Sequence, residues 1–181
     1  MTVANAKTTI TQDSVERHID KLTKLWKAGM QSSKDPEVQV SKSPYNKPHS
    51  KLKRSVYTLV KKCVEHNLIH VIEKRVMLQH ENSGTFKPSD SNKKNPFYWG
   101  LLAVCTKRNP LPRSNLHRFA LELQYANMHD VPVHFLIGFI YQIGTSEGLQ
   151  DKIRNSIMQP WFKDGQNKPL SENKSKKQRS D

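Results

Sequence analysis

Eight histidines are the residues of this chain whose chemistry extends to metal binding and proton transfer. His66, His70 and Glu73 are spaced by four and then three positions, so on a helix they would share one face, as zinc ligands can. Their order is not that of an HExxH motif, and no cysteine stands where it would complete a tetrahedral site. We therefore interpret these three side chains as polar surface residues.

Two further pairs of histidines are candidates for acid–base chemistry. His129 and His134 flank Asp130, but an aspartate just before a proline is typical of a helix N-cap, so we interpret this segment as a turn. His49 and His117 both lie in lysine- and arginine-rich surroundings. A small metal-independent ribonuclease that uses histidine with lysine is therefore one alternative function.

Other common catalytic motifs are absent from the sequence. None of its seven glycines stands in a GxGxxG or GxxxxGK order, so the usual phosphate-cradling loops are excluded, and GxSxG is missing as well. The two lysine- and arginine-rich segments, residues 38–64 and 91–121, hold no carboxylates, so they cannot bind two metal ions as carboxylate clusters do. We therefore predict a protein that is not an enzyme and has no catalytic residues, metal ligands or cofactors.

The net charge of +14 is concentrated in two stretches without a single acidic residue. Residues 38–64 and 91–121 together hold thirteen basic side chains, whereas the rest of the chain is nearly neutral. Such blocks create a strong local field, and nucleic acid is the commonest polyanion that matches one. The predicted nucleic-acid-binding residues are Lys42, Tyr45, Lys47, Lys51, Lys53, Arg54, Lys61, Lys62, Lys93, Lys94, Lys107, Arg108, Arg113 and Arg118.

The residue types in the two blocks favour contact with phosphates over reading of bases. Lysines outnumber arginines 22 to 8, and lysine suits backbone phosphate whereas arginine reads guanine edges. Tyr45 and Tyr98 stand beside cations, a mixture that suits single strands, although Tyr98 also suits a core, as Phe97 does more clearly. Residues 116–143 have helix-turn-helix lengths, but the second helix would present apolar side chains such as Phe135, so we reject it as a DNA reader.

The spacing of apolar residues predicts an all-α fold, a single compact bundle of about six or seven helices. Residues 68–79 suit a helix or a strand, and we favour a helix. Residues 132–143 are apolar on all sides, which predicts a buried central helix. The helices are expected at about 13–30, 50–67, 68–79, 96–106, 114–128, 132–143 and 147–158.

Helical geometry also assigns faces and caps to particular side chains. At 100° per residue, the positions in the predicted second helix that lie opposite its apolar face are Lys51, Arg54, Lys61 and Lys62. Asp13 is expected to cap the first helix in a capping box with Glu16. Arg118 and Glu122, four residues apart, are predicted to pair on an outward face.

Length and composition predict one domain at 13–162, between a flexible leader (1–12) and a disordered basic tail (163–181), with long loops at 31–49 and 80–96. No apolar run approaches the ~18 residues of a membrane span, and the N-terminus lacks a signal-peptide core. We therefore predict an intracellular, cytoplasmic protein with no membrane contact. Cys63 and Cys105 are expected to be reduced core thiols, a disulfide between them being the less favoured alternative.

These observations together predict a non-catalytic nucleic-acid-binding protein, an accessory subunit of a nucleoprotein complex. We expect it to contact the phosphate backbone of RNA or DNA with little sequence specificity, and to have protein partners in the complex. Besides the ribonuclease, the other alternative is a protein–protein interaction module for an acidic partner.

Overall fold

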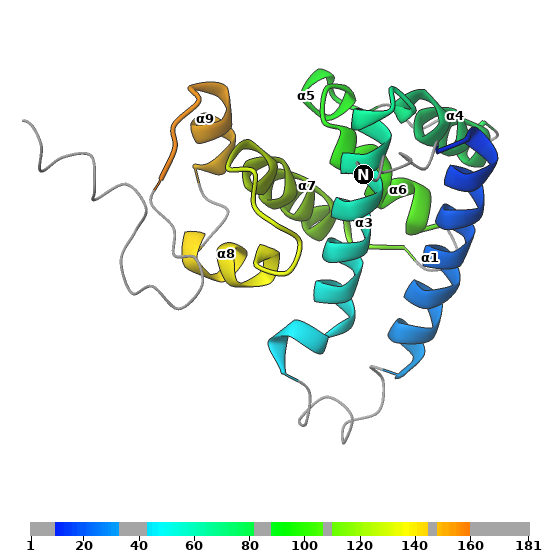
Figure 1. The fold of residues 1–181 in the computed structure, drawn as a ribbon, viewed down its shortest axis with the longest axis horizontal. Coiled ribbons are helices and arrows are strands. Elements are labelled where there is room, and N and C mark those ends of the chain that lie inside the picture. The colour runs from blue at the N-terminus through cyan, green and yellow to red at the C-terminus, as the bar shows by residue number, and fades with distance from the viewer. Residues whose placement is uncertain (1–9, 33–42, 82–87, 107–109, 145–147, 160–181) are drawn as a thin grey trace, which may run out of the picture.

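A computed structural model describes residues 10–32, 43–81, 88–106, 110–144 and 148–159. The predicted tail at 163–181 and most of the predicted leader lie outside these ranges. Every regular element in the described ranges is helical, so the all-α prediction is confirmed (Figure 1). The order along the chain is α1 (Gln12–Ser32), the 3-10 turn η1 (Pro44–Asn46), α3 (Pro48–Glu65), α4 (Ile69–His80), the single turn α5 (Asp90–Lys93), α6 (Pro96–Val104), α7 (Arg113–Met128), α8 (Leu136–Ile143) and α9 (Leu149–Arg154).

The antiparallel pair α1 and α3 forms one side of the molecule (Figure 1). Their apolar side chains recur at helical spacing and are buried: Val15, Ile19, Leu22 and Trp26 on α1, and Leu52, Val56, Leu59, Val60 and Cys63 on α3. The cap of α1 differs from the prediction. Thr11 and Ser14 hydrogen-bond to each other's backbone N–H, whereas Asp13 lies within the first turn of the helix.

The segment with ambiguous periodicity, 68–79, is the helix α4, as favoured from the sequence. Its buried residues Val71, Ile72 and Val76 follow the helical period and face α1 and α6. Leu68, the N-cap residue of α4, immediately follows the left-handed residue Asn67, whose φ is 58°. Asparagine tolerates that conformation better than most residues, which allows the tight turn between α3 and α4.

The centre of the core is α6, not the helix that the sequence predicts there. α6 contacts α1, α3, α4 and α7, and seven of its nine residues are buried. α8 lies at the edge of the molecule, with Gly138, Tyr141 and Gln142 exposed (Figure 1). It also begins at Leu136 rather than at residue 132. The prediction of a central 132–143 helix is therefore wrong. The segment contains many apolar residues, but Gly138 and Tyr141 lie on its solvent-exposed face, and neither is polar enough to mark that face in the sequence.

Gly100 permits the close approach of α6 to α3. A Cβ atom added there would lie 2.5 Å from Val60 Cγ2 and 3.0 Å from Val56 Cγ1. Valine is stiff at χ1, so neither methyl group can turn away. We expect Gly100→Ala to lower the free energy of unfolding by about 1–3 kcal/mol, measured by urea denaturation.

A glycine in α8 provides the matched control for this substitution. Nothing lies within 4 Å of a Cβ added at Gly138. Gly138→Ala should therefore stabilise the protein by about 0.5–1 kcal/mol through helix propensity. If Gly100→Ala stabilised the protein as well, the close packing of α6 on α3 would be contradicted.

Both cysteines are buried and unpaired, as predicted. Burial raises the pKa of Cys63 to about 11 and that of Cys105 to about 12, so both stay protonated thiols at neutral pH. In the described part of the chain, no helix has the length and apolar character needed to cross a membrane.

Candidate nucleic-acid interface

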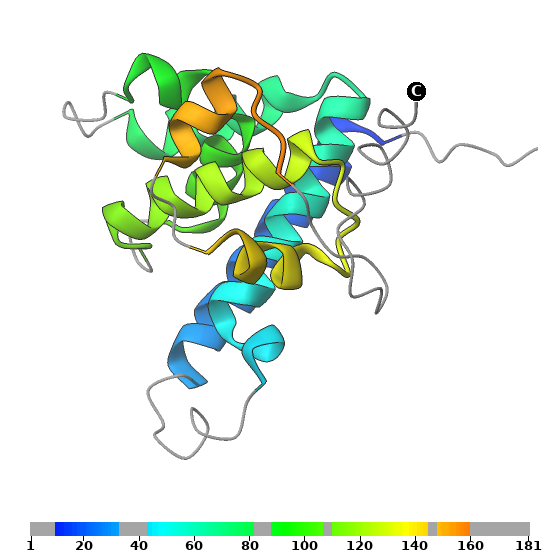
Figure 2. The same cartoon turned by 90° about the vertical axis from the view of Figure 1, so that its left-hand side faces the viewer.

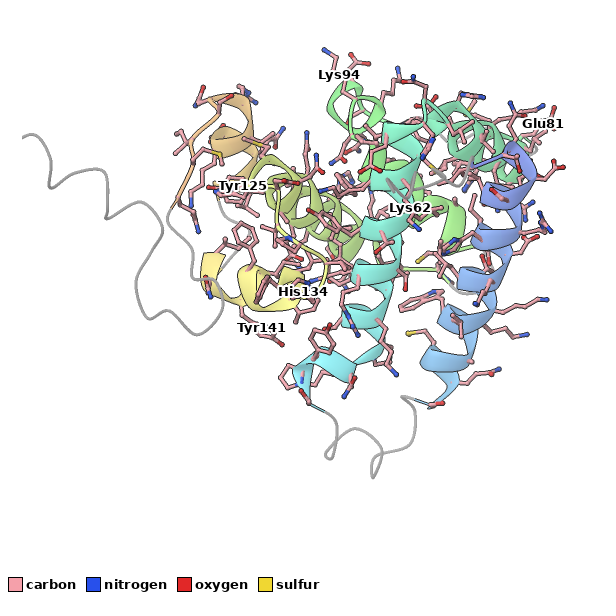
Figure 3. The ribbon with its side chains drawn as sticks, viewed as in Figure 1. Lys62, Glu81, Lys94, Tyr125, His134 and Tyr141 are labelled. Atoms are coloured by element: carbon pink, nitrogen blue, oxygen red, sulfur yellow. The ribbon has the colours of Figure 1, made fainter. Side chains whose placement is uncertain are left out.

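The outer face of α3 carries basic side chains, as its periodicity predicts. Lys51 and Lys62 are exposed, and Arg54 and Lys61 are partly exposed, on the side opposite the buried residues of the helix. Figure 3 shows Lys62 on the side of α3 that faces the viewer. The first basic block therefore presents four of its cations along one helix.

Part of this face forms a row of four polar side chains, which we call the polar stripe of α3: Lys51, Ser55, Thr58 and Lys62. The exposed Glu65 follows Lys62 by three residues at the end of the helix. The four positions of the stripe follow the spacing i, i+4, i+7 and i+11, which keeps them on one line along a helix. The line is about 17 Å long at 1.5 Å per residue. A cation stands at each end and hydroxyl groups stand between them.

Three members of the polar stripe, Lys51, Ser55 and Thr58, line one wall of an open groove whose other wall is the C-terminal half of α1, and Lys62 lies beyond the groove. The groove has a volume of about 580 Å³. Its lining residues are Leu22, Leu25, Trp26, Ala28, Gly29, Ser32, Tyr45, Asn46, Pro48, Lys51, Leu52, Arg54, Ser55, Thr58, Val133 and His134. None of them is acidic, so the field in the groove is positive.

Beyond the groove, towards the N-terminus of α1, the cations continue. The pKa of His18 lies below its ordinary value, first because of burial and then because of the positive charges of Lys62 and Lys21. These three groups are therefore close enough to interact, and α1 adds Lys21 to the charge of the polar stripe. Sequence reasoning did not assign Lys21 to the interface, because it lies outside both acid-free blocks.

Arg54 and Tyr45, predicted as separate contacts to nucleic acid, bind each other. The Arg54 guanidinium carbon lies 3.6 Å from the centre of the Tyr45 ring, and Nη2 donates a hydrogen bond of 3.1 Å to the Tyr45 carbonyl oxygen. This stack fixes η1 on α3 and leaves both side chains lining the groove.

Lys53 and Arg118, one from each acid-free block, meet on the carboxylate of Glu122. The Glu122 side chain is 7 % exposed, so the prediction that it faces outward is wrong, although its pairing with Arg118 is present. The Lys53 ammonium lies 3.9 Å from the centre of the Phe119 ring, on the core side of α3. Burial lowers the pKa of Lys53, and the charge of Glu122 partly offsets that shift.

Two other predicted contacts also pair with carboxylates. Lys61 Nζ lies 2.7 Å from Asp130 Oδ1, and Lys93 Nζ lies 3.1 Å from Asp90 Oδ1. The hydrogen bond from Lys61 lowers the pKa of Asp130 below its ordinary value. Both aspartates are exposed, so these pairs are weak, but they reduce the local positive charge.

The remaining predicted residues are spread over the molecule. Lys47, Lys94 and Arg113 are exposed and pair with no carboxylate of the described ranges. In Figure 2, α5, which Lys94 directly follows, and the first turn of α7, which contains Arg113, lie to the left, and the C-terminal half of α3 lies to the right. The second block therefore does not extend the groove. Lys42, Lys107 and Arg108 lie outside the described residues.

The aromatic residues of the second block belong to the core. Phe97, Tyr98 and Trp99 are all buried, with exposures of 2 %, 6 % and 6 %. Burial raises the pKa of Tyr98, and the neighbouring charge of Arg113 opposes that shift. These rings cannot act as stacking platforms for bases while the fold is intact.

The histidines considered for chemistry are not assembled into a site. His49 contacts the rings of Trp26 and Phe119, whereas His117 contacts Tyr98. His129 contacts the Tyr125 carbonyl through Nδ1 and accepts a hydrogen bond from a backbone N–H through Nε2, which fixes it as a structural residue. Among the described side chains no three possible metal ligands come together, and His66, His70 and Glu73 do not form such a group.

The Glu122 cluster gives a stability prediction. We expect Glu122→Gln to lower the free energy of unfolding by about 3 kcal/mol in urea denaturation, because it leaves the Lys53 ammonium without a counter-charge in a desolvated position. Asp151→Asn, which breaks an exposed pair with Arg154, should change the same free energy by less than about 1 kcal/mol. Equal effects of the two substitutions would contradict the burial of Glu122.

Comparison with known proteins yields no match. No family model fits the chain, and no curated protein and no solved structure resembles it closely enough to count as a match. The site must therefore be interpreted from its own geometry.

Proposed function

We propose that this protein is a non-catalytic nucleic-acid-binding protein that holds the phosphate backbone along the groove between α1 and α3. The observation that carries the proposal is the acid-free lining of that groove, which includes Lys51, together with the exposed Lys62 beyond the groove at the other end of the polar stripe. Cations spaced along a rigid helix are suited to a chain of phosphates, whereas the Thr58 hydroxyl donates its hydrogen bond to the Arg54 carbonyl oxygen.

The chemistry of the groove supports affinity without strong sequence specificity. Lysine contacts phosphate as a point charge, and the one arginine of the groove, Arg54, has its guanidinium committed to Tyr45. Bidentate recognition of guanine, the commonest specific contact, is therefore not provided by the described residues of the groove.

Binding is expected to depend on salt with a moderate slope. The groove and its extension offer four cations, Lys21, Lys51, Arg54 and Lys62, so the logarithm of the affinity for a single strand should fall with the logarithm of salt concentration with a slope of about −3. Fluorescence anisotropy with labelled oligonucleotides over a salt series measures this slope. A peptide nucleic acid of the same base sequence, which has no phosphates, is the control and should not bind.

Absence of binding to every oligonucleotide at low salt would overturn the proposed function. It would favour the interaction module for an acidic protein, which the same positive groove would also attract. Incubation of RNA and DNA with the protein, with and without a chelator, tests the ribonuclease alternative, and we expect no cleavage.

Membership of a larger nucleoprotein complex in the cell interior belongs to the same proposal. Two large apolar side chains of α4, Met77 and Leu78, are 55 % and 58 % exposed, which supports a protein contact at that helix. Purification of the particle from its native host, with identification of co-purifying nucleic acid and proteins, tests this part.

A further inference from the structure

The groove between α1 and α3 has an apolar side that phosphate binding does not use. Leu25 of α1 is 57 % exposed and Val133, which precedes α8, is 39 % exposed, and both line the groove with Pro48. Behind them lie the buried side chains of Trp26 and Leu52. Exposed apolar side chains beside cations mark a binding surface more specifically than either kind of group alone.

Groups that can hydrogen-bond to the edges of bases line the same part of the groove. Asn46 and His134 contribute an amide and an imidazole, and Ser32 contributes a hydroxyl group. The volume of about 580 Å³ lies within the range of ordinary small-molecule sites. The part of the groove lined by Leu25, Val133, Asn46 and His134, which we call the recess, can therefore accept flat, partly apolar groups with polar edges.

Double-stranded and single-stranded nucleic acids differ in what they could place there. A duplex keeps its base faces stacked inside and offers phosphates and groove edges, so Leu25 and Val133 would gain nothing from it. A single strand has unstacked bases that can leave the backbone and pack on apolar or aromatic side chains. An acidic peptide would use the cations but has a flat group only where it carries an aromatic residue, whereas every nucleotide of a single strand carries a base.

We propose that the groove binds single-stranded nucleic acid, with bases packed against Leu25 and Val133 while the flanking phosphates lie on Lys51 and Lys62. This inference rests on the proposed function and adds the class of strand that is recognised. The bases supply part of the affinity in a sequence-tolerant way, because every base has an apolar face.

The test compares three probes of equal length on the full-length chain by fluorescence anisotropy, of which the two single strands have the same number of phosphates and the duplex has about twice as many. They are a labelled oligothymidylate of about 12 nucleotides, the same backbone with abasic sites throughout, and a blunt duplex of that length. We expect the oligothymidylate to bind about tenfold or more tightly than either of the other two. A polyglutamate peptide of similar charge serves as the fourth probe and should bind no better than the abasic strand.

Variants of the recess locate the effect. Leu25→Ser with Val133→Ser should reduce affinity for oligothymidylate to that of the abasic strand and leave affinity for the abasic strand and the salt slope unchanged. Met158→Ser, which alters a similarly exposed side chain beyond α9 and outside the groove, is the control and should have no effect. Because Leu25, Val133 and Met158 are exposed, circular dichroism should show an unchanged helix content for each variant.

The outcomes distinguish a failure of the single-strand inference from a failure of the proposed nucleic-acid-binding function. Equal binding of the abasic strand, or of the duplex, would overturn the inference and leave phosphate binding in place. Loss of binding to all three oligonucleotides would overturn the proposed function itself. Preferred binding of polyglutamate would overturn both and identify an acidic polypeptide as the occupant.

Discussion

Charge reversal at the two ends of the polar stripe, Lys51→Glu with Lys62→Glu, is expected to lower affinity for a labelled single strand at low salt by about 100-fold or more. Under the proposed function, each substitution would remove a contact with phosphate and place a negative charge where a phosphate would lie. Both lysines are exposed, so the fold does not depend on them. Anisotropy titration measures the loss, and circular dichroism should show the same helix content as the original chain.

A second charge reversal, in the other acid-free block, provides the control for the first. Lys93→Glu with Lys94→Glu changes the net charge of the protein by the same amount, but on α5, which is not part of the groove. We expect it to reduce affinity by less than about threefold at moderate salt, where screening limits long-range effects. If both double variants lost affinity equally, binding would follow net charge rather than the groove, and the site would be wrong.

The first acid-free block contributes side chains to the groove and the second does not, and this difference could not be predicted from the sequence of the blocks alone. The second block was defined by the absence of acids between residues 91 and 121, yet the acids just outside its ends, Asp90 and Glu122, pair with Lys93 and Arg118. Each pair follows helical spacing, i,i+3 or i,i+4, which crosses the end of the block. A charge block in sequence is therefore a charge patch in space only where carboxylates of the adjacent helical turns do not pair with its cations; Glu65 follows Lys62 by three residues, but no ion pair joins the two.

The secondary structure was predictable because periodicity reports on it directly. The apolar stripes of α1 and α3 and the basic face of α3 follow from 100° per residue, and the structure confirms them. Even α4, whose residues suited a strand as well, contains a spacing of buried residues that only a helix explains. Helix boundaries differed by a few residues, because caps such as Thr11 depend on local hydrogen bonds that several neighbouring side chains could make.

Helical periodicity could also have predicted the buried ion pair between Lys53 and Glu122. Lys53 is seven residues from Val60, and Glu122 is three from Phe119, so each charge lies on the apolar face of its own helix. One unmatched charge of each sign on two apolar faces predicts that the helices pack with the charges together. Assigning Lys53 to the interface from block membership alone missed this signal.

The groove itself could not be predicted from the sequence. It requires the separation of α1 and α3, the position of η1 and the approach of Val133 from the turn before α8, and these come from parts of the chain far apart in sequence. Periodicity indicates which face of a helix is apolar but not how far apart two helices lie. For the same reason the exposed Leu25 was not recognised as part of a site, since single exposed apolar side chains are common.

The position of α8 leads to the largest expected loss of stability. Phe139 is 1 % exposed, and its ring centre lies 5.0 Å from that of His129 and 6.0 Å from that of Tyr125, both on the C-terminal part of α7. We expect Phe139→Ala to lower the free energy of unfolding by about 3–5 kcal/mol, because it removes a buried aromatic ring and leaves a cavity between α7 and α8. Urea denaturation followed by circular dichroism measures this loss.

The same helix supplies a control that separates packing from helix propensity. Tyr141 lies two residues further on and is 63 % exposed, so Tyr141→Ala should change the free energy of unfolding by less than about 1 kcal/mol. If α8 were the central helix that its composition suggests, both substitutions would be costly, because a ring at either position would be buried. If Phe139→Ala cost no more than Tyr141→Ala, α8 would not be anchored to α7 at all. A large effect at Phe139 alone is the result that a peripheral helix with one buried face requires.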